Sequence, residues 1–300
     1  MRVDPNYVSG LVASLNASTL AEQKLTTELS SGLAVSSLSD NPVAAGQASL
    51  LGSAISQDDS FVQTAASTQS LLQVSTSALG SVVTQLTSAL SLAVAGNSGT
   101  NNPADLSSIS QQLASVRDQV VSLANTSYQG TFIFAGSQGD VKPYTIDTST
   151  SPAAVTYNGD AQVGSVTTEN GQQIQTGLAG SSVFSAPGAD VLAALNNLVA
   201  DFASGTVSST AATDIGVLQT ALGNVSQQES VLGNSLSRLN SASTYAQTDA
   251  TNRTAAASTL VAADPASVAT QLSAAETQNQ ALMSVIATVE KQSLFDHLPG

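Results

Sequence analysis

Very few residues in this sequence could support catalysis. The single histidine, His297, follows Asp296 close to the end of the 300-residue chain. A histidine that acts as a general base needs an orienting partner and a pocket that holds both groups near a substrate. A dipeptide so near the terminus offers neither, so we interpret His297 as a solvated or partner-facing side chain. The sequence contains no cysteine, which excludes thiolate chemistry and a disulfide framework.

Carboxylates are the remaining candidates for acid–base or metal chemistry. Asp58 and Asp59 are adjacent, but neighbouring residues on a helix face different directions, so we interpret the pair as part of a solvated helix face. Asp140, Asp147 and Asp160 lack the spacing of a calcium-binding loop, which favours plain surface charge. The sequence has no phosphate-binding glycine loop, nucleophile elbow or metal-ligand cluster. We therefore expect no enzymatic activity, no cofactor and no metal.

Composition narrows the function classes further. Apolar residues make up 42% of the chain, enough for a sizeable core, while charged residues make up only 9% and the net charge is −14. The seven Lys and Arg residues are thinly spread and form no basic patch, which argues against a nucleic-acid or anionic-membrane surface. The N-terminus lacks the pattern of a cleaved secretory signal, and no apolar run approaches the roughly 18 residues of a membrane span.

Three internal segments have apolar residues at alternating three- and four-residue steps, the heptad pattern of packed helices. Each segment predicts a long amphipathic helix. The loop 96–106 is short and rich in turn residues, so the two helices that it joins should be antiparallel neighbours. Asn102 before Pro103 is typical of an N-cap followed by proline at the first helical position. The three segments are 61–93, 106–123 and 218–250.

The two ends of the chain carry heptad seams that polar residues interrupt. Isolated helices of this quality are marginal in water, so we expect them to pair with each other and then with neighbouring copies of the protein. The N-terminal seam runs through Val8, Leu11, Leu15, Ser18, Glu22, Leu25 and Leu29. The C-terminal seam runs through Val268, Leu272, Ala275, Asn279, Leu282, Ile286 and Val289.

Between the helical regions the periodicity changes to that of short strands. Asn158-Gly159 and Asn170-Gly171 are dipeptides typical of hairpin turns, and 190–202 predicts a short amphipathic helix. The prediction is a mainly α fold, in which the N- and C-terminal regions form a long antiparallel helical bundle or coiled coil with a small β-rich domain inserted at 131–205. The β-type runs are 131–136, 144–146, 154–157 and 163–166.

A polar stretch separates the first predicted helix from the next. Gly32 is placed to end the first helix with positive φ, and Asn41 before Pro42 is typical of a new helix start. Asp40 adds negative charge near the positive end of the second helix. We interpret the segment as a hinge between the terminal helix and the main bundle.

Several motifs resemble those of the bacterial flagellin family. The Leu-Ser-Ser-Gly-Leu stretch at 29–33 and the following Ser-x-x-Asp-Asn-Pro are similar to a pattern in flagellins, with Asn41 in place of the usual second Asp. Within that family, the segment 124–138 (ANTSYQGTFIFAGSQ) resembles the exit from the bundle in the hook–filament junction type, called FlgL. VTYNGD at 155–160, GLAGSSVF at 177–184, LGNSLSRL at 232–239 and the terminal SLFDHL fit the same type.

The resemblance implies a structural adaptor between the flagellar hook and the flagellin filament. Such proteins contact another hook-associated protein on the hook side and flagellin on the other, and they associate with themselves in a ring. They are extracellular, exported by the flagellar type III apparatus without a cleaved signal, and held beforehand by a chaperone of the FlgN type. The implied layers are an inner coiled coil (1–41 and 258–300), a bundle (42–130 and 206–257) and an outer domain (131–205).

The same resemblance assigns roles to particular residues. Hinge residues would be Gly32, Asp40, Asn41 and Pro42. The junction between bundle and insert would hold Asn125, Tyr128, Gly130, Phe132, Phe134 and Gly136, with the aromatic side chains packing there. The residues that bury against the partner helix and neighbouring subunits would be Leu11, Leu15, Leu25, Leu29, Val268, Leu272, Leu282, Ile286 and Val289.

Three other functions fit the sequence less well. A flagellin-type filament subunit belongs to the same family, but the pattern at 155–184 favours the junction type. A helical-bundle enzyme such as an oligomeric lyase would need a cluster of polar catalytic groups, for which one histidine and seven basic residues offer little. A surface adhesin with a coiled-coil stalk would normally need a secretion signal or an anchor.

Overall fold

The computed structural model describes residues 5–147, 149–150 and 153–295, which divide into two compact units. The first unit holds the residues up to Gln57 and those from Asp249 onward, and the second is Asp58–Thr248. Helices α2 (Pro42–Gly96) and α6 (Ala211–Val261) contribute residues to both units.

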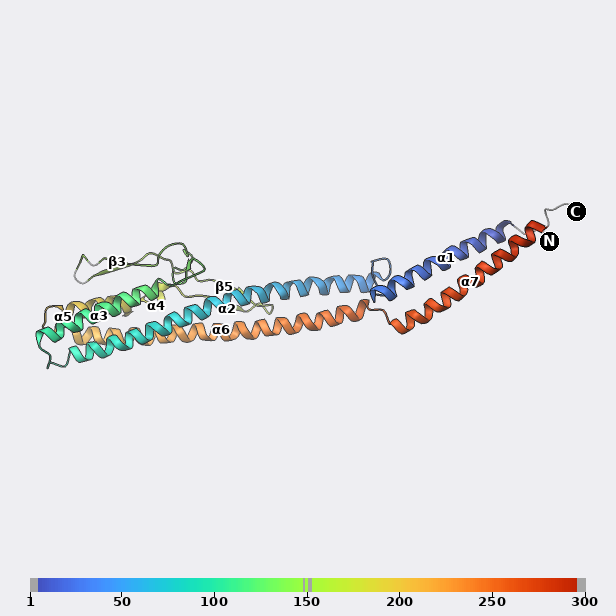
Figure 1. The fold of residues 1–300 in the computed structure, drawn as a ribbon. Coiled ribbons are helices and arrows are strands. Elements are labelled where there is room, and N and C mark those ends of the chain that lie inside the picture. Colours follow the sequence, from blue (N-terminus) through green and yellow to red (C-terminus); the bar gives the residue numbers. More distant parts are fainter. Residues whose placement is uncertain (1–4, 148, 151–152, 296–300) are drawn as a thin grey trace. The chain divides into compact units, whose positions relative to one another are not determined.

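Two long helices from opposite ends of the chain make up most of the first unit. Helix α1 (Pro5–Ser31) and helix α7 (Pro265–Phe295) lie side by side in Figure 1, blue and red respectively. A β-bridge between Leu33 and Ala262 joins the loops at which these helices meet the rest of the unit. The expected pairing of the two terminal helices is confirmed.

The second unit is built around the predicted internal helices. These are α2, α3 (Pro103–Ala124) and α6, and α5 (Val191–Ala203) packs with them. Each helix buries the face that carries its regularly spaced apolar residues, and together these faces form one apolar core. The predicted helix at 190–202 is therefore confirmed as α5. Fully buried core residues include Leu72, Leu79, Leu86, Leu113, Leu198, Leu218, Leu232 and Leu239.

Local sequence sets where α3 begins. The Asn102 side chain accepts from the backbone N–H of Asp105 at 2.9 Å, and the Asp105 side chain accepts in return from the Asn102 N–H. Pro103 occupies the first helical position, where its missing N–H costs no hydrogen bond. The predicted N-cap is confirmed and is completed by a capping box.

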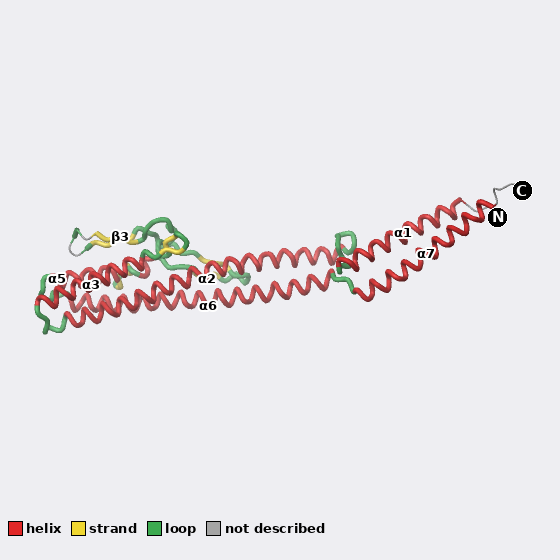
Figure 2. Tube along the Cα trace, in the orientation of Figure 1, coloured by secondary structure: helices red, strands yellow, loops and turns green. Residues whose placement is uncertain are grey.

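Short β-hairpins make up most of the chain between α3 and α5, together with the single-turn helix α4 (Gly180–Val183). Within the described residues they form four separate antiparallel pairs rather than one sheet. The pairs are β1 (Ser127–Tyr128) with β2 (Thr131–Phe132), β3 (Tyr144–Asp147) with β4 (Ala154–Tyr157), β5 (Ser165–Thr167) with β6 (Gln173–Gln175), and β7 (Ser185–Ala186) with β8 (Ala189–Asp190). Figure 1 and Figure 2 show β3 beside α3, whereas β5 lies farther along the bundle, beside α2 and α6.

The two predicted hairpin dipeptides have different outcomes. Asn170-Gly171 lies in the β5–β6 turn, where Gly171 has φ +76° and the Thr168 N–H donates to the Gln172 carbonyl oxygen at 2.8 Å. Asn158-Gly159 does not form a hairpin turn, because it follows β4 and the Asn158 N–H donates to the Pro143 carbonyl oxygen instead. The run predicted at 131–136 is a strand only over Thr131–Phe132.

Helix α2 is long and apolar enough to cross a membrane by length and composition alone, although no uninterrupted apolar run in it suggested a span. The core helix of a globular bundle has the same composition, since it is apolar on the face that it buries. Leu72, Leu79 and Leu86 of α2 are fully buried within the second unit. We therefore assign this part of α2 to the bundle core.

Candidate assembly interface

The predicted seam residues of α1 and α7 lie along the contact between these helices, but most are only half-buried. Val268 is 5% exposed, whereas Leu29 is 40% exposed. A two-helix pair has too little apolar surface to enclose its own seam, so the seam stays partly open to solvent or to a further chain. Half-buried members are Leu11, Leu15, Leu25, Leu272, Leu282, Ile286 and Val289, while the side chain of Val8 lies outside the described part of the structure.

The polar interruptions in the two seams meet each other. The Asn279 side-chain N–H donates to Glu22 Oε2 at 2.8 Å, and both side chains are half-buried. Ser18, one turn before Glu22, is 8% exposed. Among the described residues, Ser18 Oγ and Asn279 Oδ1 are buried without a hydrogen-bond partner. These three residues, called the polar layer below, replace apolar packing at the middle of the seam.

Large apolar side chains also stand on the outer faces of the two helices. Val12 is 43% exposed, Leu20 66%, Met283 59% and Val285 40%. A groove beside the polar layer is lined by apolar and polar side chains together: Leu15, Thr19, Glu22, Gln23, Thr26, Thr27, Asn279 and Met283. Apolar surface of this kind on a long helical pair favours contact with further chains.

Most hydroxyl groups on these helices are already hydrogen-bonded within their own helix. Thr26 Oγ1 donates to the Glu22 carbonyl oxygen at 2.8 Å, and Thr277 Oγ1 donates to that of Ser273, also at 2.8 Å. Each bond reaches the carbonyl one turn earlier, a common arrangement for these side chains in helices. The same contact is made by Ser14, Thr19, Thr27, Thr270 and Thr288.

The loop after α1 has the helix-terminating features expected from its sequence. Gly32 has φ +71°, and its N–H donates to the Glu28 carbonyl oxygen at 2.8 Å, which ends α1. The Asn41 side chain accepts from the Ala44 N–H at 3.1 Å, and Pro42 is the first residue of α2. Bending of the chain at these residues stays a prediction.

Asp40 organises the same loop through several donors. One carboxylate oxygen accepts from the backbone N–H groups of Ser36 and Ser37 at 3.2 and 3.0 Å. The other lies 3.1 Å from Lys24 Nζ of α1. The Lys24 ammonium, helped by the serine donors, holds the pKa of Asp40 well below its usual range. The position of Asp40 predicts only a negative charge near the start of α2. In the structure Asp40 also connects the loop to α1 through Lys24.

Backbone hydrogen bonds also join this loop to the segment between α6 and α7. The Ala34 N–H donates to the Val261 carbonyl oxygen at 2.8 Å, and the Ala263 N–H donates to that of Gly32 at 2.9 Å. No local pattern predicted this pairing, because the two segments are far apart along the chain. A hinge motion in this loop would break these backbone hydrogen bonds unless the two segments moved together.

At the exit from α3, the Asn125 side chain holds the first residue of β3. Its amide donates to the Tyr144 carbonyl oxygen at 2.9 Å, and its oxygen accepts from the Tyr144 N–H at 2.8 Å. Gln129 and Gly130 form the turn between β1 and β2, both with positive φ, and flanking Tyr128 and Phe132 are half-buried. The predicted junction residues therefore lie where the bundle helix gives way to the hairpins.

Phe134 is fully buried in an aromatic cluster at this junction. Its ring meets that of Phe184 edge to face, with centroids 5.3 Å apart, and Phe184 contacts Tyr144 in the same way at 5.6 Å. Tyr144 also packs against Tyr157. Burial raises the pKa of both tyrosine hydroxyls. The sequence pattern predicts packing at Phe134 but not at Tyr144, Tyr157 or Phe184. Tyr144 and Tyr157 lie in predicted β-type runs, and Phe184 ends the motif at 177–184.

Gly136 permits a close approach between two loops of the insert. It has φ +74°, and a Cβ there would come within 2.4 Å of the Asp160 carbonyl oxygen. The Asp160 carboxylate accepts from the Ser137 N–H at 2.8 Å and the Gln162 N–H at 3.0 Å. Ser137 chiefly lowers the pKa of Asp160. Asp160 thus has a structural contact in addition to the surface charge expected of it.

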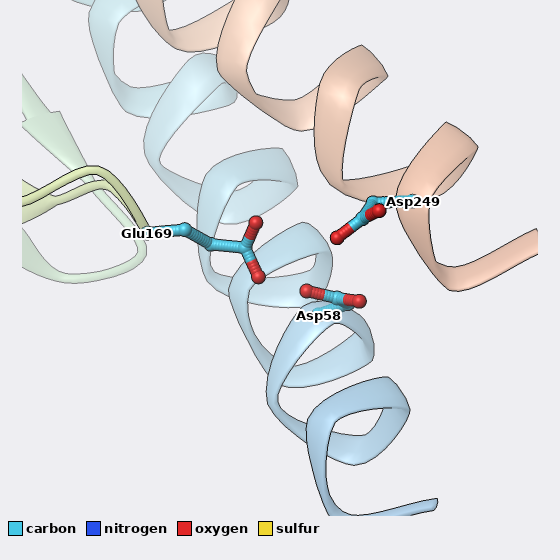
Figure 3. A group of neighbouring side chains, drawn as sticks. All are labelled: Asp58, Glu169 and Asp249. Atoms are coloured by element: carbon cyan, nitrogen blue, oxygen red, sulfur yellow. The ribbon is translucent and has the colours of Figure 1, made fainter. Parts of the chain in front are cut away.

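One carboxylate differs from its sequence interpretation. Asp58 is fully buried, whereas Asp59 is exposed. The reason is register: Asp58 lies three residues before Phe61 and so continues the inward heptad seam of α2. Figure 3 shows its carboxylate facing that of Glu169, with oxygens within 4.8 Å, and both residues have interaction partners. Asp249, also drawn, belongs to the first unit. His297 lies outside the described residues.

Comparison with known proteins identifies the helical ends. Residues 8–139 match the bacterial flagellin N-terminal helical region, and residues 215–298 match the bacterial flagellin C-terminal helical region. Together these matches cover more than two thirds of the chain and include α1 from residue 8 onward and the whole of α7. The chain belongs to the bacterial flagellin family.

Individual members of the flagellin family add detail. The chain is 27% identical over 287 residues to flagellar hook-associated protein 3 of Escherichia coli, covering 89% of this chain and 90% of that protein. It is 32% identical over 122 residues to the Salmonella typhimurium protein of the same name, a match that covers 40% of this chain and 38% of that protein. The flagellar junction protein FlgL of Legionella pneumophila has a similar fold, with a TM-score of 0.56, 12% identity, and coverage of 65% of this chain and 99% of that one.

Proposed function

We propose that this flagellin-family chain is a structural adaptor that joins the flagellar hook, through another hook-associated protein, to the flagellin filament. The observation that carries the proposal is the α1/α7 pair. The family's terminal helical regions include all of α7 and α1 from residue 8 onward. The seam of the pair is mostly half-buried, and apolar side chains stand on its outer faces. Similarity to proteins named hook-associated protein 3 favours the junction over the filament itself.

The proposed partners follow from this role. Copies of the chain associate in a ring through heterologous contacts, which suit a head-to-tail arrangement of identical subunits. Flagellin and another hook-associated protein contact the two sides of that ring. A chaperone of the FlgN type holds the C-terminal helix before export by the flagellar type III apparatus, and the assembled protein lies outside the cell. No catalytic activity, nucleic-acid binding or membrane binding is part of the proposal.

Each part of the chain has a place in this arrangement. Segments 1–41 and 258–300 form the inner coiled-coil layer, 42–130 and 206–257 the bundle layer, and 131–205 the outer domain. Gly32, Asp40, Asn41 and Pro42 form the connection at which the inner layer adjusts to different neighbours. The residues named for the seam above would contact the paired helix on one side and a neighbouring subunit on the other.

Deletion of the gene in its host tests the proposed function. We expect cells that retain hooks, lack filaments and release flagellin into the medium, with filaments restored by a plasmid copy. Copy number provides the second measurement: a junction ring holds about a dozen subunits, whereas a filament protein is present in thousands, as the family resemblance implies. Normal filaments in the deletion strain would refute the adaptor role, and thousands of copies per filament would identify a filament subunit instead.

A further inference from the structure

We infer that the polar layer of Ser18, Glu22 and Asn279 selects the register in which α1 pairs with α7. The inference deepens the proposed function, because its biological meaning rests on assembly through the terminal helices, but it concerns only the pairing inside one chain. Its basis is the meeting of the two seam interruptions across 257 residues of sequence.

The layer is poorly suited to stabilising the pair. Asn279 donates to Glu22 at 2.8 Å, yet Asn279 Oδ1 and Ser18 Oγ are buried without a hydrogen-bond partner among the described residues. A buried polar atom without a partner costs free energy that apolar side chains of similar size would not cost. A layer that lowers stability in this way has its best-attested use in fixing the alignment of two helices.

The rest of the seam does not distinguish one alignment from another. Shifting α7 by one heptad along α1 places one apolar seam residue where another had been, so most contacts survive. Leu25, for example, would face Leu282 or Val268 in place of Ala275, and all three are apolar. Apolar packing alone therefore allows slipped pairs of similar quality.

The polar layer removes this ambiguity inside the helix pair, in addition to the backbone hydrogen bonds that join the end of α1 to the segment before α7. In the observed alignment Glu22 lies opposite Asn279. A shift of one heptad in one direction places Ile286 opposite Glu22 and Leu29 opposite Asn279. A shift in the other direction places Leu272 opposite Glu22 and Leu15 opposite Asn279. In both cases a carboxylate and an amide lose their hydrogen bond and face apolar side chains, so only the observed alignment pairs these two groups with each other.

The alignment decides what the pair presents to other chains. The groove that joins Leu15, Thr19 and Gln23 of α1 to Met283 of α7 exists only while these segments stay level with each other. A slip of one heptad moves each α7 residue along α1 by about 10 Å, given the helical rise of 1.5 Å per residue. A neighbouring subunit would then meet a different surface. Register selection in one chain is thus a condition for a reproducible contact between chains.

Introduced cysteine pairs can measure the register, because the sequence contains no cysteine of its own. Leu25→Cys is combined in the purified full-length chain with Ala275→Cys for the observed alignment, or with Leu282→Cys or Val268→Cys for the two slipped alignments. Disulfide yield after mild oxidation is then read by gel mobility and mass spectrometry. With the polar layer intact, we expect the Ala275 pair to exceed either slipped pair by about tenfold or more.

The decisive variant replaces the two hydrogen-bonded members of the layer, with Glu22→Leu and Asn279→Leu. We expect the slipped pairs to rise several-fold while the helical content of the chain is kept or increased. Gln23→Leu with Gln278→Leu is the matched control. Both residues are exposed neighbours of the layer, and this variant likewise replaces one polar residue on each helix by leucine. This control should leave the Ala275 pair dominant.

Two results would overturn the inference: slipped pairs that stay at background when the layer is replaced, or an Ala275 pair that does not dominate when it is intact. Neither result depends on the role of the protein in the cell. Normal filaments in the deletion strain would refute the proposed function and leave the cross-linking result standing. A slipped-register outcome would likewise leave the adaptor role open to its own test.

Discussion

Asn125 hydrogen-bonds to both backbone groups of Tyr144, as a neighbouring strand would. The residue that ends α3 therefore positions the first residue of β3. We expect Asn125→Ala to lower the free energy of unfolding of the second unit by about 1–3 kcal/mol, because the Tyr144 groups lose their partner. Urea titration followed by tyrosine fluorescence measures this. Asn125→Asp, which keeps the acceptor and loses the donor, should fall between; an alanine variant as stable as the parent would contradict the assigned role.

Gly136 and Gly171 offer a comparison between two causes of strain. Both have φ near +75°, but a Cβ at Gly136 would meet Asp160, whereas one at Gly171 would meet nothing within 4 Å. We expect Gly171→Ala to cost about 1–2 kcal/mol from backbone conformation alone. Gly136→Ala should cost more, since the Asp160 loop must also move. Thermal unfolding of the two variants checks the order, and equal losses would show that the close approach to Asp160 is unimportant.

The Lys24–Asp40 contact predicts a pH dependence in the loop after α1. Because the folded-state pKa of Asp40 is lowered, chiefly by Lys24, the stabilisation is present above the unfolded pKa of about 4 and is lost as pH falls through the folded value. Amide exchange at Ser36 and Ser37, corrected for intrinsic rates, should stay slow from neutral pH to about 4 and accelerate below it. Asp40→Asn should remove this dependence. Glu28→Gln, at a weaker 3.8 Å contact of Lys24, should preserve it.

Charges on the seam of α7 should block assembly without unfolding the bundle. Leu282→Asp with Ile286→Asp places two carboxylates at half-buried seam positions, which should abolish filament formation and capture by the proposed chaperone. Unfolding of the second unit should be unchanged, because these residues lie in the first. Ser284→Asp with Ala287→Asp is the matched control at exposed positions. Electron microscopy of complemented cells supplies the readout, and normal filaments from the seam variant would refute the assignment of these residues.

Local patterns predicted the helices of this protein well. The internal seams of α2, α3 and α6 are regular, and the starts at Asn102 and Asn41 depend on side chains within three residues of the helix that they cap. Periodicity and capping act over short distances, so a single sequence carries them. The same holds for the turn at Asn170-Gly171, whose residues form the turn themselves.

What the sequence could not predict depends on distant contacts. Asp58 continues a seam of α2, yet its charge suggested a solvated face, and its actual burial follows from the packing of the helix. Asn158-Gly159 suits a hairpin turn, but the Asn158 N–H bonds to Pro143 of an earlier loop. The polar interruptions in the terminal seams were visible in the sequence. Their meeting at Glu22 and Asn279 required the alignment of two helices from opposite ends of the chain.

The hydroxyl groups of α1 and α7 that bond to their own helix backbone bear on how these helices can be covered. A serine or threonine whose hydrogen is already donated loses little when a neighbour displaces the surrounding water. The hydroxyl groups therefore keep the surfaces of the two helices polar, yet removing water from these surfaces costs little free energy. A contacting surface then need not supply hydrogen-bond partners for these hydroxyl groups, which suits a subunit that contacts more than one kind of neighbour.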